Sequence, residues 1–278
     1  MIEMKEFASQ LVKDKVGLIG AIGISIIVIV SLFASVIAPF SPEKMFTDSI
    51  LQSPNATYYF GTDEFGRDIF SRIIYGAQVS VRVSLIAVGI GASLGLIFGL
   101  ISGYFQGKVD SVIMRVMDVL FAFPDILLAL AIVAVLGANI TNTMIAIGIV
   151  FTPVFTRTVR AATISVKENE YIQSAVAIGV RPFRIIIRHV FPNIVAPFIV
   201  QITLALSGAI LTEAALSFLG LGVQPPNPSW GSMLNESRTY MEFAPWTIIF
   251  PAVAIVITIF CFNLLGDSLR DILDPKMK

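Results

Sequence analysis

The chain has 278 residues, of which 56% are hydrophobic and 14% charged, and its formal net charge at pH 7 is zero. Soluble domains carry about 25% charged residues, so the composition excludes an ordinary soluble protein and indicates one integral membrane domain with no basic excess for a nucleic-acid partner. The single cysteine, Cys261, and the single histidine, His189, exclude an intrachain disulfide and a Cys/His metal cluster.

The N-terminal region is predicted to be a retained membrane anchor. Residues 1–15 are polar, and the run from Val16 to Phe40 carries no charge. This run is much longer than the ~7–15-residue core of a signal peptide and exceeds the ~20 residues that span a bilayer.

The apolar runs predict an all-α integral membrane fold with six transmembrane helices. The fourth run is short, and Pro124 interrupts the third. The predicted spans are Val16–Ala38, Val83–Gly103, Val112–Leu136, Ile140–Phe155, Ile194–Ala215 and Trp246–Gly266.

The positive charges predict the orientation of these spans. If the N-terminus is cytoplasmic, most of the 19 lysines and arginines fall in inner segments, as the positive-inside rule requires. Both termini and the polar stretch Lys167–Pro192 then lie in the cytoplasm, the compartment that holds ATP. The protein is therefore expected to be a multi-pass protein of the cell membrane.

The first outer segment, Pro39–Gln78, is expected to begin as a loop and end in a short helix capped by Thr62 or Asp63. Phe65 and Ile69 fall near one face of that helix, which is consistent with an interfacial amphipathic helix. The alternative, which the local chemistry favours, is a surface helix that only guides the chain back into the membrane.

The second span carries a glycine at every fourth position. Such a strip is smooth and lets another helix approach closely, but the sequence leaves open whether that helix belongs to this chain or to another. The four residues are Gly91, Gly95, Gly99 and Gly103.

Ionisable residues within spans are candidates for a polar path or for a clasp between helices. Asp118 and Asp125 are seven residues apart, on one face of the third span, and Arg115 lies one turn from Asp118 as its predicted ion-pair partner. Pro124 is expected to kink this helix. Glu213, late in the fifth span, is expected to bond a neighbouring helix.

The stretch Lys167–Pro192 predicts two short helices separated by a sharp bend. The first runs from about Glu168 to Ile178, and Gly179 ends it at the C′ position. Pro182 starts the second helix, and Pro192 ends it. Small residues and a basic stripe suit a docking element, but a loop whose arginines touch lipid headgroups fits the spacing equally well. The stripe consists of Arg181, Arg184 and Arg188.

The sequence lacks the motifs for nucleotide binding and for serine-based catalysis. The chain has no G-x-x-x-x-G-K-[ST] loop for nucleotide phosphates, and it has no G-x-S-x-G sequence or credible serine–histidine dyad. The sequence therefore predicts no catalytic residue, no bound metal or cofactor, and no enzymatic activity of its own.

Four motifs in order resemble the permease subunits of ABC importers of the dipeptide, oligopeptide and nickel type. Three are GTDEFGRDIFSR from Gly61, GKVDSVIMRVMDVLFAFP from Gly107 and SFLGLGVQPPNPSWG from Ser217. The fourth resembles the permease EAA loop, in which Glu-Ala-Ala is followed by a conserved spacing of Gly and Pro. Gly179 and Pro192 match that pattern, whereas Gln173 and Ser174 replace the usual Glu and Ala.

The resemblance implies a type I importer permease fold and a mechanism. The loop at 167–192 would be a coupling helix seated in a cytoplasmic ATPase, and ATP closure of two such ATPases would rock the spans to open toward an extracytoplasmic binding protein. Gln173 cannot make the salt bridge expected of the usual glutamate. The implied contact residues are Glu170, Tyr171, Gln173, Ser174, Ala175, Gly179, Arg181, Arg184 and Pro192.

The predicted function is therefore that of a permease that forms a heterodimer with a second, homologous permease in the lipid bilayer, with ATP and magnesium held by the partner ATPases. The expected substrate is a di- or oligopeptide, and a nickel chelate is the alternative. A self-sufficient ion-coupled transporter using Asp118, Asp125 and Glu213 is the remoter alternative. We expect residues 1–78 to form the anchor helix with the external segment, and residues 79–278 to form a five-span permease core.

Overall fold

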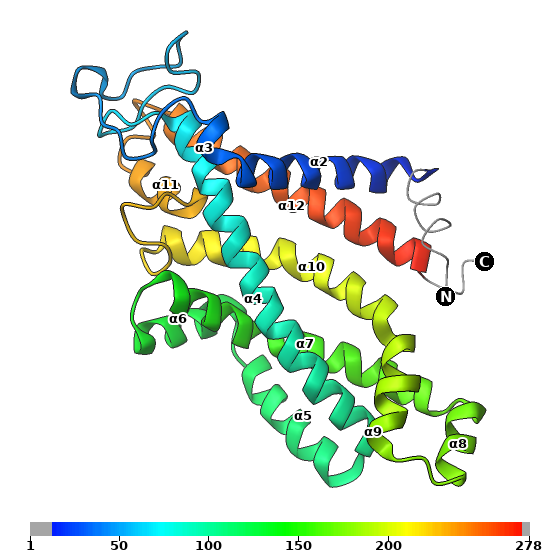
Figure 1. The fold of residues 1–278 in the computed structure, drawn as a ribbon. Coiled ribbons are helices and arrows are strands. Elements are labelled where there is room, and N and C mark those ends of the chain that lie inside the picture. The colour runs from blue at the N-terminus through cyan, green and yellow to red at the C-terminus, as the bar shows by residue number, and fades with distance from the viewer. Residues whose placement is uncertain (1–12, 274–278) are drawn as a thin grey trace.

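The computed structural model describes residues 13–273, and within this range it is a bundle of long helices with no extended sheet. Irregular loops and the short helix α11 gather at one end of the bundle, and the short helices α8 and α9 lie at the other end (Figure 1). The predicted positions of the two termini lie outside the described residues.

The helices follow the apolar runs of the sequence. In chain order they are α2 (Lys15–Leu32), α3 (Ala34–Ile37), the 3₁₀ turn η1 (Thr47–Ser49), α4 (Ile69–Phe105), α5 (Gly107–Phe121), α6 (Asp125–Leu136), α7 (Ile140–Lys167), α8 (Glu170–Ala177), α9 (Pro182–Ile185), the π-helical turn η2 (Ile186–Val190), α10 (Phe191–Phe218), α11 (Trp230–Ser237) and α12 (Trp246–Leu273).

The lengths and hydropathies of these helices confirm an all-helical membrane fold. Within residues 13–273, five helical segments are long and apolar enough to cross a bilayer, and the bent pair α5–α6 makes a sixth if it counts as one span. Two predicted spans are longer in the structure. Helix α4 begins at Ile69 rather than Val83, and α7 continues past Phe155 to Lys167.

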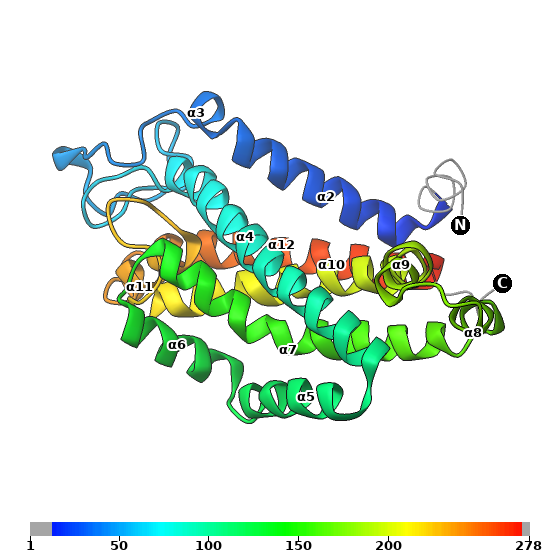
Figure 2. The ribbon, with the colours of Figure 1, turned by 60° about the horizontal axis from the view of Figure 1, so that its bottom comes forward.

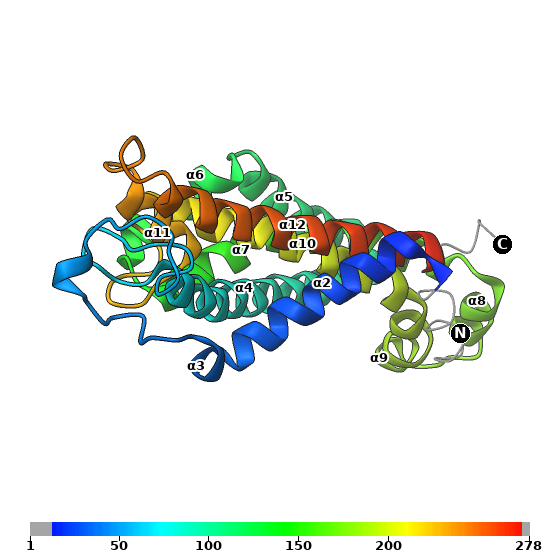
Figure 3. The same ribbon diagram turned by 90° about the horizontal axis from the view of Figure 1, so that it is seen from above.

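Helix α2 packs along α12 (Figure 3). Asp14 caps its N-terminus by accepting hydrogen bonds from the backbone of Val16 and Gly17. Gly20 faces α12 so closely that a Cβ there would lie 2.8 Å from the carbonyl oxygen of Cys261. Ile26, in the middle of α2, points away from the bundle and is 55% exposed, as expected of a side chain that faces lipid.

The prediction of a separate short helix capped by Thr62 or Asp63, whether interfacial or a surface guide, is wrong. Those residues form a loop and then the first turns of α4, and the capping residue is Asp68, whose side chain accepts from the backbone of Ser71. Ile69 is fully buried rather than turned toward an interface. A helix with no internal proline or break simply continues into the span.

The third span is broken rather than kinked. Helices α5 and α6 meet at 91°, because Pro124 adopts an extended conformation with ψ 133° at the start of α6. The prediction that Asp118 and Asp125 share one helix face is therefore wrong, since they belong to different helices. Figure 2 shows α5 beside α7 and α6 turning away from α5 toward the loop end.

The prediction that Pro192 ends a helix is also wrong. Pro192 is in the first turn of α10 and lacks the N–H that would donate a helical bond, but the helix continues through it. Helix α9 passes through the π-helical turn η2 directly into α10, so that one helical segment runs from Pro182 to Phe218.

Candidate functional site

The helical hairpin between α7 and α10 is the element that extends furthest from the spans at the α8 end (Figure 1). Its first helix, α8, is shorter than predicted, and Glu168 belongs to the end of α7 rather than to α8. Gly179 has φ +80° and follows α8 at the predicted C′ position. The N–H of Val180 donates to the carbonyl of Ala175, and that of Gly179 to Val176, which is the pair of bonds of a Schellman motif.

The base of the hairpin is pinned to the spans by a small apolar core. Ile172 of α8 and Ile185 of α9 are fully buried, and they pack in one cluster with Val159 of α7 and Ile194 of α10. Lys167 adds a polar tie, because its Nζ donates to the backbone oxygen of Tyr104 at 2.7 Å. The hairpin is therefore held rigidly against α4, α7 and α10.

The tip of the hairpin exposes large apolar side chains. Ile178 is 80% exposed and Phe183 is 75% exposed. Arg181 and Arg184, beside them in the chain, and Arg188 one turn further on are also exposed, so the hairpin combines exposed apolar side chains with positive charges. This arrangement fits insertion into a groove of another protein.

The residues singled out for the loop divide between this tip and the base. Ala175 is half-buried and packs against the chain's own apolar cluster, whereas Gly179 is exposed. Gln173 donates from Nε2 to the backbone oxygen of Glu168 at 3.1 Å. A glutamate at this position has no N–H to make that bond, so the Gln–Glu difference changes how α8 joins α7.

The glycine strip of α4 lies against α7. A Cβ on Gly95 would come within 2.2 Å of the Cβ of Phe155, and one on Gly99 within 2.6 Å of the Cβ of Val159. Gly91 and Gly103 continue the contact toward the two ends, and the partner helix belongs to this chain. The two helices form a single closely packed unit.

The charges of α5 pair with α7 rather than with one another. Asp118 binds Arg157 at 2.7 Å, so the predicted Arg115–Asp118 pair is wrong. Arg115 and Asp125 are exposed, and no ion pair within residues 13–273 involves either side chain. The helix break at Pro124 separates Asp125 from Asp118.

Glu213 is completely buried where α10 passes α4 and α11. Its Oε1 accepts a hydrogen bond from the hydroxyl of Ser217 at 2.7 Å, one turn further along the same helix. Ser217 Oγ also accepts from the backbone N–H of Val223. This local contact holds the loop after α10, and Ser80 of α4 and Ser229 before α11 also interact with the Glu213 carboxyl, in line with the predicted bond to a neighbouring helix.

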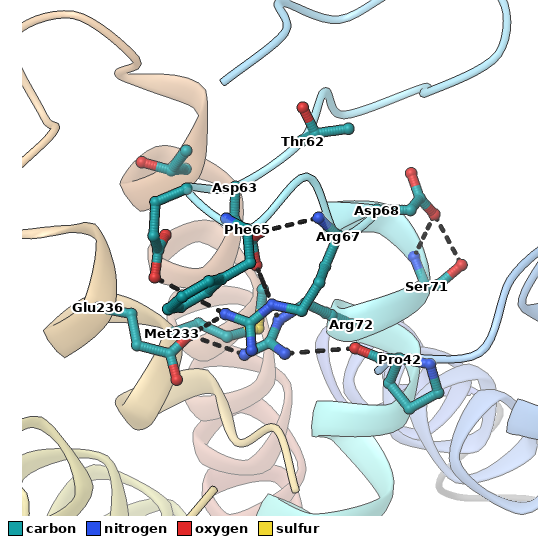
Figure 4. A network of polar contacts seen from close by, with 12 residues as sticks. Pro42, Thr62, Asp63, Phe65, Arg67, Asp68, Ser71, Arg72, Met233 and Glu236 are labelled. Carbon is teal, nitrogen blue, oxygen red and sulfur yellow. Dashed lines mark hydrogen bonds and ion pairs between the residues drawn. The ribbon is translucent and has the colours of Figure 1, made fainter. Parts of the chain in front are cut away.

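An ion network that the sequence did not reveal joins the first outer segment to α11 (Figure 4). Arg67 and Arg72 are both buried, and both bind Oε2 of Glu236, at 2.7 and 2.8 Å. Arg67 Nε also binds Asp63 at 2.6 Å. The motif GTDEFGRDIFSR therefore contributes a clasp between distant parts of the loop end, whereas Glu236 carried no local signal.

Burial raises the pKa of two carboxyl groups in and beside this network. Desolvation raises the pKa of Glu64, and nearby Asp63 and Glu236 raise it further by charge repulsion. Desolvation likewise raises the pKa of Asp68, against the hydrogen bonds that it accepts from Ser71. The loop end thus contains carboxylates whose ionised form is less stable in the folded protein than in water.

The comparisons with known proteins agree with this architecture. Residues 95–278 match the family model described as binding-protein-dependent transport system inner membrane component, and residues 4–54 match the N-terminal TM domain of oligopeptide transport permease C. Among solved structures, the inward-facing MetNI methionine ABC transporter superposes with a TM-score of 0.60 at 16% identity, covering 72% of this chain and 96% of that chain.

Similar curated proteins cover nearly the whole chain. The dipeptide transport system permease protein DppC of Alkalihalophilus pseudofirmus is 47% identical over 274 residues, which are 99% of this chain and 90% of that protein. The glutathione transport system permease protein GsiD of Escherichia coli is 46% identical over 274 residues, with 98% and 90% coverage.

The fold and the projecting hairpin define a membrane-spanning permease domain of the kind found in ABC transporters. The chain belongs to the family of binding-protein-dependent transport system inner membrane components, the permease subunits of ABC importers. The resemblance found in the sequence motifs is thereby confirmed.

Proposed function

We propose that this chain is one of two permeases of an ATP-driven importer that moves short peptides across the cell membrane. The similar proteins are named for dipeptide and for glutathione, which is itself a tripeptide, so they support a peptide rather than a nickel chelate. The proposed partners are a second permease, two cytoplasmic ATPases that hold ATP and magnesium, and an extracytoplasmic binding protein.

The exposed tip of the hairpin is the observation that carries this proposal. Ile178 and Phe183 are two large apolar side chains exposed on the same short hairpin, and grouped exposed apolar side chains are typical of a surface that another protein covers. The positive-inside distribution of the sequence supports a cytoplasmic location for the tip and for both termini. An ATPase groove is the partner that this location and the family supply.

The hairpin has a direct connection to the spans. Helix α7 enters it, and α10 leaves it without a break. Because Ile172 and Ile185 lock its base to these helices, movement of the tip is transmitted to both spans. We propose that residues 79–278 form this moving core, and that residues 1–78 form an anchor and external segment.

Substitution of Phe183 tests the docking surface. The complex of both permeases, the ATPases and the binding protein is reconstituted in liposomes, and dipeptide uptake and dipeptide-stimulated ATP hydrolysis are measured. Phe183→Ser is expected to lower both activities and the amount of ATPase that co-purifies. Phe243→Ser is the control, because Phe243 is also 80% exposed but lies in the loop before α12. Equal behaviour of the two variants contradicts the proposal.

The bend at Gly179 provides a second test. A Cβ there meets no atom within 4 Å, so only the positive φ opposes a larger residue. Gly179→Val is expected to lower coupled hydrolysis about 5- to 30-fold, from a backbone cost of about 1–2 kcal/mol. Gly179→Asn should retain most activity, since asparagine tolerates this conformation. Full coupled activity in the valine variant, with normal membrane insertion, refutes the role of the bend.

A further inference from the structure

Two ion pairs join α5 to α7, and they differ in exposure. Arg160 donates two hydrogen bonds of 2.6 Å to the carboxylate of Asp110, which also accepts one from Ser102. The hydrogen-bonding capacity of this carboxylate is therefore largely used. The Arg157–Asp118 pair has one bond of 2.7 Å, and its side chains are 46% and 60% exposed. The guanidinium and the carboxylate both keep unused hydrogen-bonding positions.

The glycine strip of α4 indicates how deep in the membrane the Arg157–Asp118 pair lies. Gly95 and Gly99 of α4 pack against residues 155–159 of α7, the segment that contains Arg157. Gly95 is the central residue of the uncharged run 83–107, which covers the second half of α4 and the turn after it. The end of the helix agrees with this depth, since Lys167, the last residue of α7, follows Arg157 by ten residues, about 15 Å of helix. Half of the ~30 Å hydrocarbon layer is the same distance.

Lipid is an unfavourable neighbour for this surface. An ion pair exposed to hydrocarbon at this depth costs several kcal/mol, and such groups face cavities, water or protein instead. The outer face of α2 shows the contrast, because the large side chains exposed in its middle, such as Ile22 and Ile26, are aliphatic.

We propose that Asp118 and Arg157 line the aqueous translocation path and bind the two charged ends of a peptide in transit. This inference rests on the proposed function. A short peptide is a zwitterion, so its ammonium group complements Asp118 and its carboxylate complements Arg157, whose planar guanidinium suits a carboxylate. The ring of Phe121 lies 4.1 Å from the guanidinium carbon and restrains Arg157 from swinging away.

Cysteine accessibility tests the exposure to water independently of the substrate. Cys261→Ala first removes the only cysteine of the chain. Asp118→Cys and Arg157→Cys are then treated, in the assembled complex, with a charged methanethiosulfonate reagent, and Ile26→Cys is the lipid-facing control. Labelling of positions 118 and 157, but not of 26, is expected. Absence of labelling at both sites, with labelling after denaturation, overturns the inference and assigns this face to lipid or to the second permease.

Transport assays test the role in binding. Asp118→Asn and Arg157→Gln are expected to lower dipeptide uptake about tenfold or more, as loss of a charge-assisted hydrogen bond does, and to raise the number of ATP molecules consumed per peptide. Glu242→Gln, at an exposed external acid, should leave uptake unchanged. Wild-type uptake in either neutral variant, or restoration by the exchanged pair Asp118→Arg with Arg157→Asp, overturns the binding role. A wild-type complex that moves no dipeptide refutes the proposed function instead, and the labelling result still decides whether the pair meets water.

Discussion

Replacing Gly95 by alanine tests whether the close contact of α4 with α7 holds the bundle together. The added methyl group would lie 2.2 Å from the Cβ of Phe155 and 2.9 Å from the backbone nitrogen of Thr156. Carbon atoms in good contact are about 3.5 Å or more apart. The two helices must therefore separate by roughly 1.3 Å at this level, and neither neighbour is the flexible end of a long side chain.

The expected cost follows from overpacking in a core, which is about 1–3 kcal/mol. Alanine also favours a helix by about 1 kcal/mol relative to glycine, so the change is best measured against a glycine in the same helix that has room. Gly89 of α4 is that control, because a Cβ there meets no atom within 4 Å. The difference between the two variants isolates the contact with α7.

Thermal unfolding of the purified chain in detergent gives this difference. Gly95→Ala is expected to unfold roughly 4–8 °C below Gly89→Ala if the contact contributes about 2 kcal/mol. Equal unfolding temperatures would refute the argument, since they would show that α4 and α7 adjust to the methyl group without loss of packing.

Two further predictions concern the clasp at the loop end. Glu236→Gln removes the negative charge shared by buried Arg67 and Arg72, and should lower the free energy of unfolding by about 3 kcal/mol, whereas Glu242→Gln should change the thermal midpoint little; similar midpoints would mean that the network contributes nothing. Burial raises the pKa of Glu64 above its ordinary value of 4.5, so its contribution to stability is full below the unfolded pKa and is lost as pH rises through the folded pKa. Glu64→Gln should therefore gain stability relative to wild type between pH 4 and pH 8, and parallel midpoint curves would contradict this.

The sequence predicted best where one residue imposes a local backbone requirement. Gly179 ends α8 with φ +80°, and Pro182 starts α9, because each position needs a conformation that few other residues adopt. Close packing along the glycine strip of α4 could also be predicted, because glycines have no side chain to keep a second helix away.

Ion-pair partners that lie far apart in the sequence could not be predicted. Asp118 binds a residue 39 positions away, and Arg67 binds one 169 positions away. Local spacing predicted Arg115, on the same helix, as the ion-pair partner of Asp118. Packing of α5 against α7 brings Arg157 to this carboxylate instead, and local spacing contains no information about such a contact. Pro192 failed for a related reason, because a proline that can end one helix can also begin the next.

The continuity of Pro182–Phe218 has a mechanical consequence. The helix measures about 55 Å along its path for 37 residues, but it is bent, since Figure 2 shows α9 end-on where α10 runs across the view. Phe183 is near one end and Glu213 near the other. The apolar cluster around Ile185 and Ile194 lies toward the Phe183 end and serves as a fulcrum for a lever. Under the proposed function, the arm toward Glu213 is the longer one, so a small displacement of the hairpin tip by the docked ATPases would become a larger one at the loop end. The π-helical turn η2 contributes Ile186 and Val190 to this cluster, so flexibility of η2 would reduce that gain at the fulcrum itself.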